Sequence, residues 1–580
     1  MKKKVLLILA VLLMCVFGAL MGNAAANPKT APVLKETTCM EQGGKIYINV
    51  LFQSAKGEKY RVYRRDDGSK SYKKLGDITT KNASGVFKDT TVKKNKVYYY
   101  TIRRVYNKNK SLSKYDATGI IASSLDTKPQ VVSHTTMQAT VRFYTVPQAS
   151  YYVLYRKAPG EAWRQLKKFA VSDAKYLEYT DIYYKTLTTA AEKKHLINDT
   201  FIDPTANPFR YEVRAITTNS TKKYIARSLY YQDGACTVGA PALSSVDVKS
   251  SKATVRWAGV PVAKSYNIYA KTTKNSTWQK LGSVNTNGKN IQNATVKITR
   301  NYTFYTVKAF ANVHGVLTAG DYEKEFYIGK RNLKNKKALF LGDSIALGRP
   351  YKGDSLVYFN YAKRVEQMLG MRCDNISITA STISDNYQSI GKTSILTDQL
   401  RQVYVGEAPN IPTGFPVTTC LTNAWQYDYI VIQGGTNDYN ASIPFGEPDS
   451  KDITTLNGAL NKIKVYINAL NAVRRSKGMA NIKVIVIDIM YALRCGGDYQ
   501  HVRCRQTTPN KLGLTAEDYK NAIRENMAQS DFPVHFISSD SVINEKNCLT
   551  ESADNLHFTK IGAGKMGKLI ADNILYWNLY

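Results

Sequence analysis

Cysteine is scarce in this sequence, with eight residues among 580. Seven of them follow residue 26, and an odd number excludes a complete disulfide framework within one chain. Histidine is scarcer still, with six residues, so each candidate base can be weighed individually. Acidic residues are also few, because 45 Asp and Glu stand against 81 Lys and Arg. The chain is therefore strongly basic, and anionic partners are expected.

Long apolar runs are missing as well, except near the first residue. Lys2-Lys3-Lys4 precedes an apolar run from Val5 to Met21, and Ala24-Ala25-Ala26 offers the small residues that a signal peptidase needs. This pattern predicts a signal peptide over residues 1–26 and a secreted protein, extracellular or associated with the cell wall. No second apolar run is visible, so no membrane span is expected after cleavage.

Residues 27–330 have the pattern of three diverged copies of one β-module. An alternating, tyrosine-rich strand recurs at intervals of about 90 and 115 residues, as Tyr60 to Arg64, Tyr152 to Arg156 and Tyr266 to Ala270. Such spacing fits β-sandwiches. We expect all-β, immunoglobulin-like sandwiches over residues 27–125, 126–238 and 239–330. In their aromatic spacing the three modules resemble fibronectin type III domains.

Residues 331–580 change character, because short apolar runs alternate there with amphipathic stretches. Strands are expected over 338–341, 375–379, 429–433, 482–490 and 534–537, and helices over 358–369, 460–475, 516–528 and 561–576. This alternation predicts a three-layer, flavodoxin-like α/β domain with a mainly parallel five-stranded sheet, so the chain as a whole is multidomain. Residues 385–425 and 439–455 lack periodicity and are long enough to cover a site.

Three polar segments of this region carry side chains suited to catalysis. Gly342-Asp343-Ser344 ends the first apolar run, Gly435-Thr436-Asn437-Asp438 follows the third, and Asp554-Asn555-Leu556-His557 lies near the last residues. Functional loops of a parallel sheet lie at the carboxyl ends of its strands. A second Gly-Asp-Ser at residues 353–355 follows Pro350-Tyr351-Lys352 instead of a buried strand, and we interpret it as a loop coincidence.

The three segments supply a nucleophile, an oxyanion donor and a base. Ser344 Oγ is predicted to attack an ester carbonyl, while His557 takes its proton and Asp554 orients the imidazole. The Ser344 backbone N–H and the Asn437 side-chain amide are the expected oxyanion donors. This chemistry requires no cofactor and no metal.

In this order the segments resemble the SGNH or GDSL hydrolase family, whose blocks run Gly-Asp-Ser, Gly, Gly-x-Asn-Asp and Asp-x-x-His. The resemblance covers about residues 336 to 580 and implies a serine ester hydrolase. The second block departs from the family, because Ala380 stands where the pattern expects glycine. Its N–H could serve as a third oxyanion donor, but its methyl group intrudes where glycine allows close approach.

Several of these residues also have structural interpretations. Asp343 is expected to hydrogen-bond the turn that presents Ser344. Asp438 is expected to brace a loop, since one acid already stands beside the histidine, and Gly435 supports the same turn. Asn437 could be a plain turn residue, although its position after a buried strand favours the functional role. Neither His501 nor His535 has an acid at an orienting spacing, which favours a loop residue and a strand-start residue.

Charge is distributed unevenly along the chain. Counting Lys and Arg against Asp and Glu, residues 27–330 carry about +28 and residues 331–580 about +5. Such modules are expected to bind an anionic surface, for example a cell-wall polymer or an acidic polysaccharide, unless the charge only keeps them soluble. Secretion argues against nucleic acid.

The cysteines leave two interpretations open in one loop. Cys495 and Cys504 flank a glycine-containing segment after the fourth expected strand, and a disulfide between them would brace a loop at the rim of the site. With His501 between them a metal site is the less favoured alternative, because structural zinc sites show tighter spacings and need four ligands.

These observations predict a secreted serine esterase that acts on acyl esters, O-acetyl groups among them, of a carbohydrate or cell-wall polymer. Lipid esters are a competing substrate within the same chemistry. A surface-binding adhesin with an inactive hydrolase domain is the alternative from a different class, motivated by Ala380 and by modules that fill half of the chain.

Overall fold

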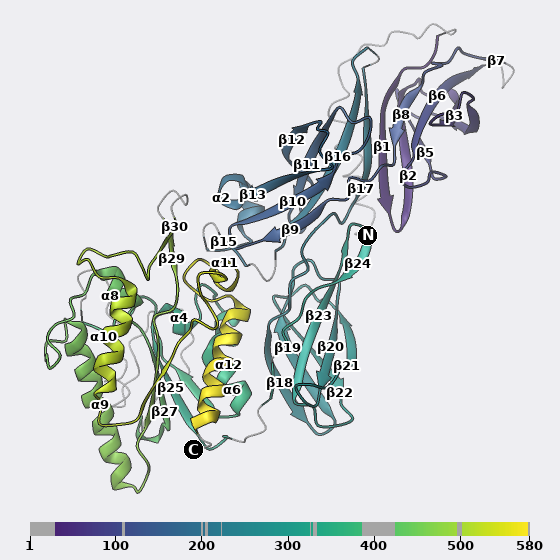
Figure 1. The fold of residues 1–580 in the computed structure, drawn as a ribbon. Coiled ribbons are helices and arrows are strands. Elements are labelled where there is room, and N and C mark those ends of the chain that lie inside the picture. The colour runs from purple at the N-terminus through teal and green to yellow at the C-terminus, as the bar shows by residue number, and fades with distance from the viewer. Residues whose placement is uncertain are drawn as a thin grey trace.

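The computed structural model contains three β-modules followed by an α/β domain (Figure 1). It describes residues 30–106, 111–198, 201–203, 207–221, 223–324, 326–328, 333–385, 424–495 and 502–577. The expected signal peptide and most of the stretch from 385 to 425 lie outside these residues. Within them, no helix is long and apolar enough to cross a membrane.

Each β-module is built from two antiparallel sheets that enclose one core. The third module shows the arrangement most simply, with a three-stranded sheet facing a four-stranded one. Its strands, in sheet order, are β18 (Leu243–Lys249), β19 (Lys252–Ala258) and β22 (Ile291–Lys297), then β21 (Gln279–Asn285), β20 (Ser265–Lys271), β23 (Phe304–Val313) and β24 (Val316–Ala319). Alternating burial along β19 and β20 places every second side chain of these two strands in the core.

The first two modules follow the same plan. The first consists of β1 (Leu34–Gln42), β2 (Lys45–Gln53) and β5 (Ser84–Asp89), facing β4 (Lys73–Thr79), β3 (Lys59–Asp66), β6 (Val97–Tyr106), β7 (Ser111–Leu112) and β8 (Ile120–Ser123). The second consists of β13 (Tyr176–Ile182), β10 (Gln138–Tyr144) and β9 (Gln130–His134), facing β12 (Arg164–Ala170), β11 (Tyr151–Lys157), β16 (Arg210–Asn219) and β17 (Tyr224–Tyr231). The predicted all-β sandwiches are confirmed.

The recurring tyrosine has the same role in all three modules. Tyr60, Tyr152 and Tyr266 are at most 4% exposed. In each case the hydroxyl accepts a hydrogen bond of 2.9 Å from a backbone N–H five or six residues upstream. A buried hydroxyl needs such a partner, which explains why the repeat retains tyrosine at this position.

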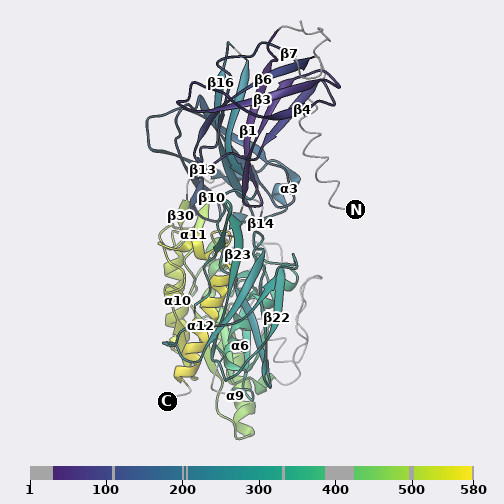
Figure 2. The same cartoon turned by 90° about the vertical axis from the view of Figure 1, so that its right-hand side faces the viewer.

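The first and second modules share one continuous sheet. Strand β1 pairs in parallel with β17, and the result is a seven-stranded sheet in the order β12-β11-β16-β17-β1-β2-β5. Figure 2 shows these two modules together, above the third module and the α/β domain. The first and second modules are thus joined by backbone hydrogen bonds and do not form structurally independent domains.

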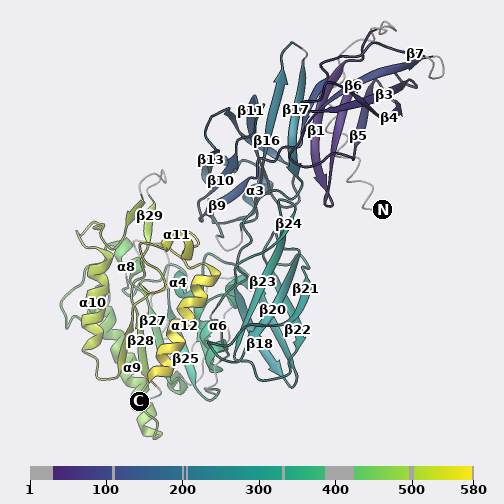
Figure 3. The same cartoon turned by 45° about the vertical axis from the view of Figure 1, so that its right-hand side comes forward.

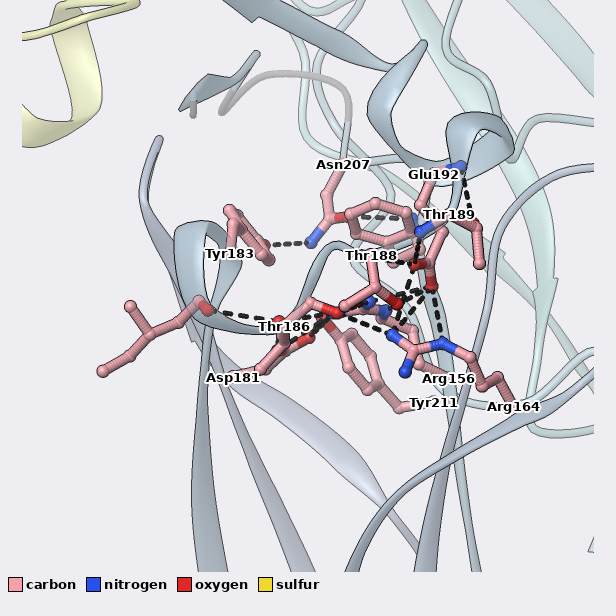
Figure 4. Close-up of polar contacts among 12 residues, drawn as sticks. Arg156, Arg164, Asp181, Tyr183, Thr186, Thr188, Thr189, Glu192, Asn207 and Tyr211 are labelled. Carbon is pink, nitrogen blue, oxygen red and sulfur yellow. Dashed lines mark hydrogen bonds and ion pairs between the residues drawn. The ribbon is translucent and has the colours of Figure 1, made fainter. Parts of the chain in front are cut away.

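Among the described residues of the three modules, only the second carries an insertion with helices. Between β13 and β16 lie α2 (Tyr183–Thr186), α3 (Ala190–Lys193), β14 (Leu196–Asn198) and β15 (Phe201–Ile202). The corresponding connections in the first and third modules are residues 90–96 and 298–303. A buried polar network at Arg156 holds the insertion in place (Figure 4).

The C-terminal domain, residues 333–577, is a three-layer α/β structure. Its five parallel strands are β26 (Arg372–Asn375), β25 (Lys337–Gly342), β27 (Tyr429–Gln433), β28 (Lys483–Ile487) and β31 (Val534–Ile537), in that sheet order. Helices α6 (Tyr361–Leu369) and α12 (Lys560–Trp577) pack in one core cluster, and α9 (Leu456–Ser476) and α10 (Ala516–Ala528) in the other. Figure 3 shows the two helical layers on either side of the sheet. The predicted fold class is confirmed.

Most boundaries in this domain agree with the periodicity, and the differences have local causes. Helix α9 begins four residues earlier than expected because Thr455 caps it and accepts a hydrogen bond from the Gly458 N–H. Helix α6 begins three residues later, after the cap Asn360. Strand β26 spans Arg372–Asn375 and shares only Asn375 with the strand expected over 375–379, although the N–H groups of Ile376 and Ile378 still bond to β25.

The third module is attached directly to the C-terminal domain. Arg364 of α6 is 4% exposed, pairs with Glu323 and donates to the Leu243 carbonyl at 2.7 Å. Tyr327 donates to Asp572 of α12 at 2.8 Å. A buried arginine that bridges two domains fixes their relative orientation.

Candidate active site

Ser344 lies where the sequence placed it, just after strand β25, which is next to the central strand β27. It starts the short helix α4 (Ser344–Leu347) and is 8% exposed. The Asp343 carboxylate accepts the Ile345 N–H at 2.8 Å, which is the turn-bracing contact expected for this residue. Asn375 adds a bond of 2.8 Å to the Ala346 carbonyl. The serine is therefore held by a rigid turn.

His557 and Asp554, which lie near the last residues of the domain in sequence, are next to Ser344 in the structure. His557 Nε2 is 2.8 Å from Ser344 Oγ, and its Nδ1 is 2.8 Å from Asp554 Oδ2. Asp554 also accepts the His557 backbone N–H at 2.7 Å, so this carboxylate fixes both the ring and the loop. The side chains of His557 and Asp554 are 14% and 4% exposed. One imidazole thus links a serine hydroxyl to a carboxylate.

Asn437 lies at the same edge of the sheet as Ser344, because β25 and β27 pair side by side up to Gly342 and Gln433. It is the second residue of α8 (Thr436–Ala441). Its Nδ2 donates to the Ser381 carbonyl at 2.9 Å, which fixes the orientation of the amide. A second amide hydrogen remains as a donor.

Gly435, which caps α8, has a steric reason to be glycine. Its φ is +98°, and an added Cβ would lie 2.7 Å from Ile523 Cδ1 and 2.8 Å from Ile489 Cδ1. Any side chain here would displace the turn that presents Asn437.

Ala380 adopts the conformation that explains the glycine in the family pattern. Its φ is +67°, in the left-handed region that costs alanine about 1–2 kcal/mol. The next N–H, of Ser381, donates to the Ile378 carbonyl at 3.2 Å. No hydrogen bond from the Ala380 N–H is found within the described ranges, so this group can donate elsewhere.

Asp438 makes the contacts of a loop-bracing carboxylate. It accepts hydrogen bonds from the N–H groups of Ile383 and Ser384, at 2.9 and 3.0 Å, and from the Ser384 hydroxyl at 2.8 Å. Burial raises its pKa. The carboxylate thereby fixes the segment after Ala380 to helix α8.

Asp343 is fully buried beside the serine, and its ionisation should affect stability. Burial above all, and the nearby Asp438, raise the pKa of its carboxyl to about 6. A pKa that is higher in the folded state stabilises the fold while the group is protonated. This contribution is complete below the unfolded value of about 4 and is lost as the pH rises through about 6.

The variant Asp343→Asn tests this dependence, because its amide oxygen can still accept the Ile345 N–H but cannot ionise. Compared with wild type, its free energy of unfolding should rise between pH 4 and pH 7, by on the order of 3 kcal/mol, since one pKa unit corresponds to about 1.4 kcal/mol. Urea unfolding of both proteins across this range measures the difference. A difference that does not change with pH would contradict the raised pKa.

The second Gly-Asp-Ser makes none of the contacts described above for Ser344, His557 and Asp554. Gly353 caps a five-residue surface helix, α5 (Asp354–Tyr358), so the segment is helical and not the loop we expected. Asp354 is exposed and Ser355 half-buried.

Of the two other histidines that the sequence singled out, the structure describes only His535. His535 is the second residue of β31, bonds to Asn573 at 2.9 Å, and has a pKa lowered to about 4 by burial. His501 lies outside the described residues. In the part of the chain that the structure describes, no group of three or more His, Cys, Asp or Glu side chains is placed to hold a metal ion.

The suspected disulfide between Cys495 and Cys504 is wrong. Cys504 is a free thiol whose Sγ lies 3.4 Å from Gln506 Oε1. Strands β29 (Leu493–Cys495) and β30 (Val502–Cys504) pair so that Cys504 faces Leu493 and Cys495 faces Val502. The two cysteines are therefore diagonal neighbours, about 7–8 Å apart in such pairs, and a disulfide needs a shorter Cα separation.

Sequence reasoning missed the residues that support the site. The Ser381 carbonyl orients Asn437, and Asn375 braces the helix after Ser344. Both act on partners 29 or more residues away, so no local pattern marks them.

Comparisons with known proteins agree with this geometry. The sequence profile of the family described as GDSL-like Lipase/Acylhydrolase matches residues 339–570. A search of curated proteins gave no match.

Three solved structures illustrate the range of similarity. A protein from Lactobacillus plantarum is 20% identical, with 42% of this chain and 97% of that chain covered and a TM-score of 0.30. An acetyl xylan esterase from the rumen bacterium Butyrivibrio proteoclasticus is 14% identical, with 58% and 95% covered and a TM-score of 0.25. The FN1-FN3 domains of chicken CNTN1 are 14% identical, with 52% and 99% covered and a TM-score of 0.17. All three scores are below 0.5, so the family assignment rests on the profile match.

The matched residues span the parallel sheet and every segment that brings Ser344, Asn437 and His557 to its edge. A serine hydroxyl bonded to a histidine is the kind of nucleophile that ester hydrolysis uses. The C-terminal domain of this chain therefore belongs to the GDSL-like lipases and acylhydrolases and is a serine ester hydrolase.

Proposed function

We propose that this chain is a secreted serine esterase that removes acyl groups, with O-acetyl groups as the main target, from a carbohydrate or cell-wall polymer. Ser344 is the nucleophile, His557 the general base and acid, and Asp554 the residue that orients the imidazole. The observation that carries the proposal is the pair of 2.8 Å contacts that link the hydroxyl, the ring and the carboxylate.

The reaction would proceed in two stages. As Ser344 Oγ attacks the ester carbonyl, His557 Nε2 takes the hydroxyl proton and then passes it to the leaving alcohol. An acyl-enzyme remains, and water activated by the same ring releases the acid. Asp554 keeps the Nδ1 proton facing the carboxylate and stabilises the charged ring.

The oxyanion of each tetrahedral intermediate would be held by three donors. They are the Ser344 N–H, the Asn437 side-chain amide and the Ala380 N–H. Helix α8 and the Ser381 carbonyl hold the amide in place before substrate arrives, which is the preorganisation that such a site needs.

The substrate class is inferred from the modules. Their excess of positive charge favours an anionic polymer over a neutral lipid surface. Several of their tyrosine rings are covered by cations, such as Tyr47 by Lys88 at 3.7 Å and Tyr230 by Arg214 at 3.6 Å. We therefore propose that the positive charge of the modules attracts the polymer, and that their tyrosine rings do not stack on its sugars.

Release of p-nitrophenol from acetate, butyrate and longer acyl esters by the full chain tests the function, with Ser344→Ala beside it. Turnover that is fastest on acetate and absent from the variant supports deacetylation. A preference for long acyl chains would instead identify a lipid hydrolase. Turnover that persists in the variant would contradict the assigned nucleophile.

Replacing Asn437 by alanine should lower kcat for p-nitrophenyl acetate by about 100- to 1,000-fold, because one oxyanion donor is lost. KM should change little, since the oxyanion forms only during the reaction. Steady-state kinetics measure both constants. The matched control is Asn440→Ala, in the same helix but on an exposed residue, which should react like wild type. Equal losses in both variants would show damage to the helix instead of a lost donor.

A further inference from the structure

The insertion of the second module reaches the loop that carries His557. Figure 1 places β9 and β15 of this module next to α11 (Cys548–Glu551), just before that loop. Asp203, which follows β15, is 6% exposed although it belongs to a surface insertion. A buried carboxylate needs hydrogen-bonding or charged partners, and the other domain supplies two of them.

Those partners are Tyr351 and Lys560 of the hydrolase domain. The buried Tyr351 hydroxyl donates to Asp203 Oδ2 at 3.2 Å and accepts the Lys560 backbone N–H at 3.2 Å. Lys560 Nζ is 3.4 Å from the same carboxylate oxygen. Because Lys560 is the first residue of α12 and follows His557 by three positions, Asp203 holds the end of the catalytic loop.

A second contact lies within the catalytic loop itself. Asn555, between Asp554 and Leu556, has a φ of +65° and is 2% exposed. Its Nδ2 is 3.7 Å from the Sδ of Met137, which lies in the turn between β9 and β10. On the other side its carbonyl accepts the Leu493 N–H at 3.0 Å. The loop is thus held between the second module and β29.

The module presents both contacts from one rigid unit. The Ile202 N–H donates to the Thr136 carbonyl at 2.8 Å, and the Tyr183 N–H to the Met137 carbonyl at 3.0 Å, so the insertion and the turn are tied together. The fully buried Arg156 fastens the insertion to the sandwich through Asp181 and Glu192 (Figure 4).

We propose that the second β-module is a working part of the active site, in which Asp203 is a positioning residue that holds His557 in place through Tyr351 and Lys560. The inference rests on the proposed function of Ser344 and His557. The second module then does more than deliver the enzyme to a surface, because the hydrolase domain depends on it for the geometry of its base.

Loss of this support should reduce the chemical step and not binding. A general base must lie within hydrogen-bond reach of the proton that it takes, and misplacement by about 1 Å costs on the order of 100-fold in rate. Asp203→Ala in the full chain should therefore lower kcat for p-nitrophenyl acetate by about 10- to 100-fold, with KM changed less than about threefold.

The conservative variant separates positioning from general damage. Asp203→Asn keeps an oxygen that can accept the Tyr351 proton, so it should restore most of kcat. Met137→Ala, on the other contact, should lower kcat by about 3- to 10-fold and provides a second test if Asp203→Ala does not fold. The control is Glu178→Ala, which removes an exposed carboxylate from the same module and should leave both constants unchanged.

The rate at which a fluorophosphonate labels Ser344 distinguishes this proposal from the proposed function. Phosphonylation also needs a well-placed His557 but no ester substrate. If no ester is hydrolysed and Ser344 still reacts, slower labelling of Asp203→Ala supports positioning while the esterase assignment fails. Full kcat and full labelling rates in both Asp203→Ala and Met137→Ala overturn the proposal, and so does a change confined to KM.

Discussion

Replacing Ser344 by alanine is expected to lower kcat for p-nitrophenyl acetate by about 10⁴-fold or more. The hydroxyl that His557 Nε2 contacts at 2.8 Å is the group that would form the acyl-enzyme, and no neighbouring residue of the turn can replace it. Residual catalysis by positioning and oxyanion stabilisation alone is typically about 10³–10⁴-fold above the reaction in water. Initial rates over a range of substrate concentrations, with mass-spectrometric detection of the acyl-enzyme, measure the loss.

The second Gly-Asp-Ser offers a matched control for this experiment. Ser355→Ala removes a hydroxyl from the same tripeptide in helix α5, and its kcat should stay within about twofold of wild type, because Ser355 takes no part in the contacts between Ser344, His557 and Asp554. The Ser355→Ala variant should also form the acyl-enzyme, as wild type does. If Ser355→Ala lost activity and Ser344→Ala kept it, the nucleophile would have been assigned to the wrong copy.

Replacing Arg156 by methionine is expected to destabilise the second module by about 3–5 kcal/mol. Arg156 is fully buried and bonds to Asp181 at 2.7 and 3.0 Å and to Glu192 at 2.8 and 3.2 Å. Without it the Asp181 carboxylate stays buried with only the hydroxyls of Tyr211 and Thr186 as partners among the contacts in Figure 4. An uncompensated buried charge accounts for most of the expected loss.

Arg142 of β10 provides the comparison in the same module. It bonds to Glu178 of β13 at 2.6 Å, but both side chains are more than a third exposed. Arg142→Met should therefore cost at most about 1 kcal/mol. Urea unfolding of the full chain, followed by hydrogen exchange of amides in β10, β11 and β13, measures both variants. If both variants lowered the free energy of unfolding by similar amounts, burial would not explain how much the Arg156 ion pairs contribute to stability.

The sequence predicted where the candidate catalytic segments lie, because parallel strands impose a simple geometry. Buried runs that end in Gly342-Asp343-Ser344 and Gly435-Thr436-Asn437-Asp438 must bring their polar residues to one edge of the sheet, so their convergence followed from the pattern. The order of the blocks then placed His557 with them. Local periodicity also predicted five strands and four helices of this domain. The helix errors arose at the caps Thr455 and Asn360, whereas the second strand, expected over 375–379, is shifted to Arg372–Asn375.

The sequence did not determine the cysteine pairing in the same domain. Spacing suggested a bridge between Cys495 and Cys504, but the register of β29 and β30 places the two residues diagonally. Register depends on which backbone groups pair across a hairpin, and the separation of two cysteines along the chain does not specify it.

Only the tertiary structure decided how the modules and the hydrolase domain are joined. The parallel pairing of β1 with β17, and the contacts of Asp203 with Tyr351 and Lys560, connect residues 148 or more positions apart. Such contacts leave no periodic or compositional signal, because each partner is an ordinary polar residue in its own segment. The sequence therefore determined the chemistry of the site, which depends on residue types at strand ends, while the packing of separate domains determined what holds that site in place.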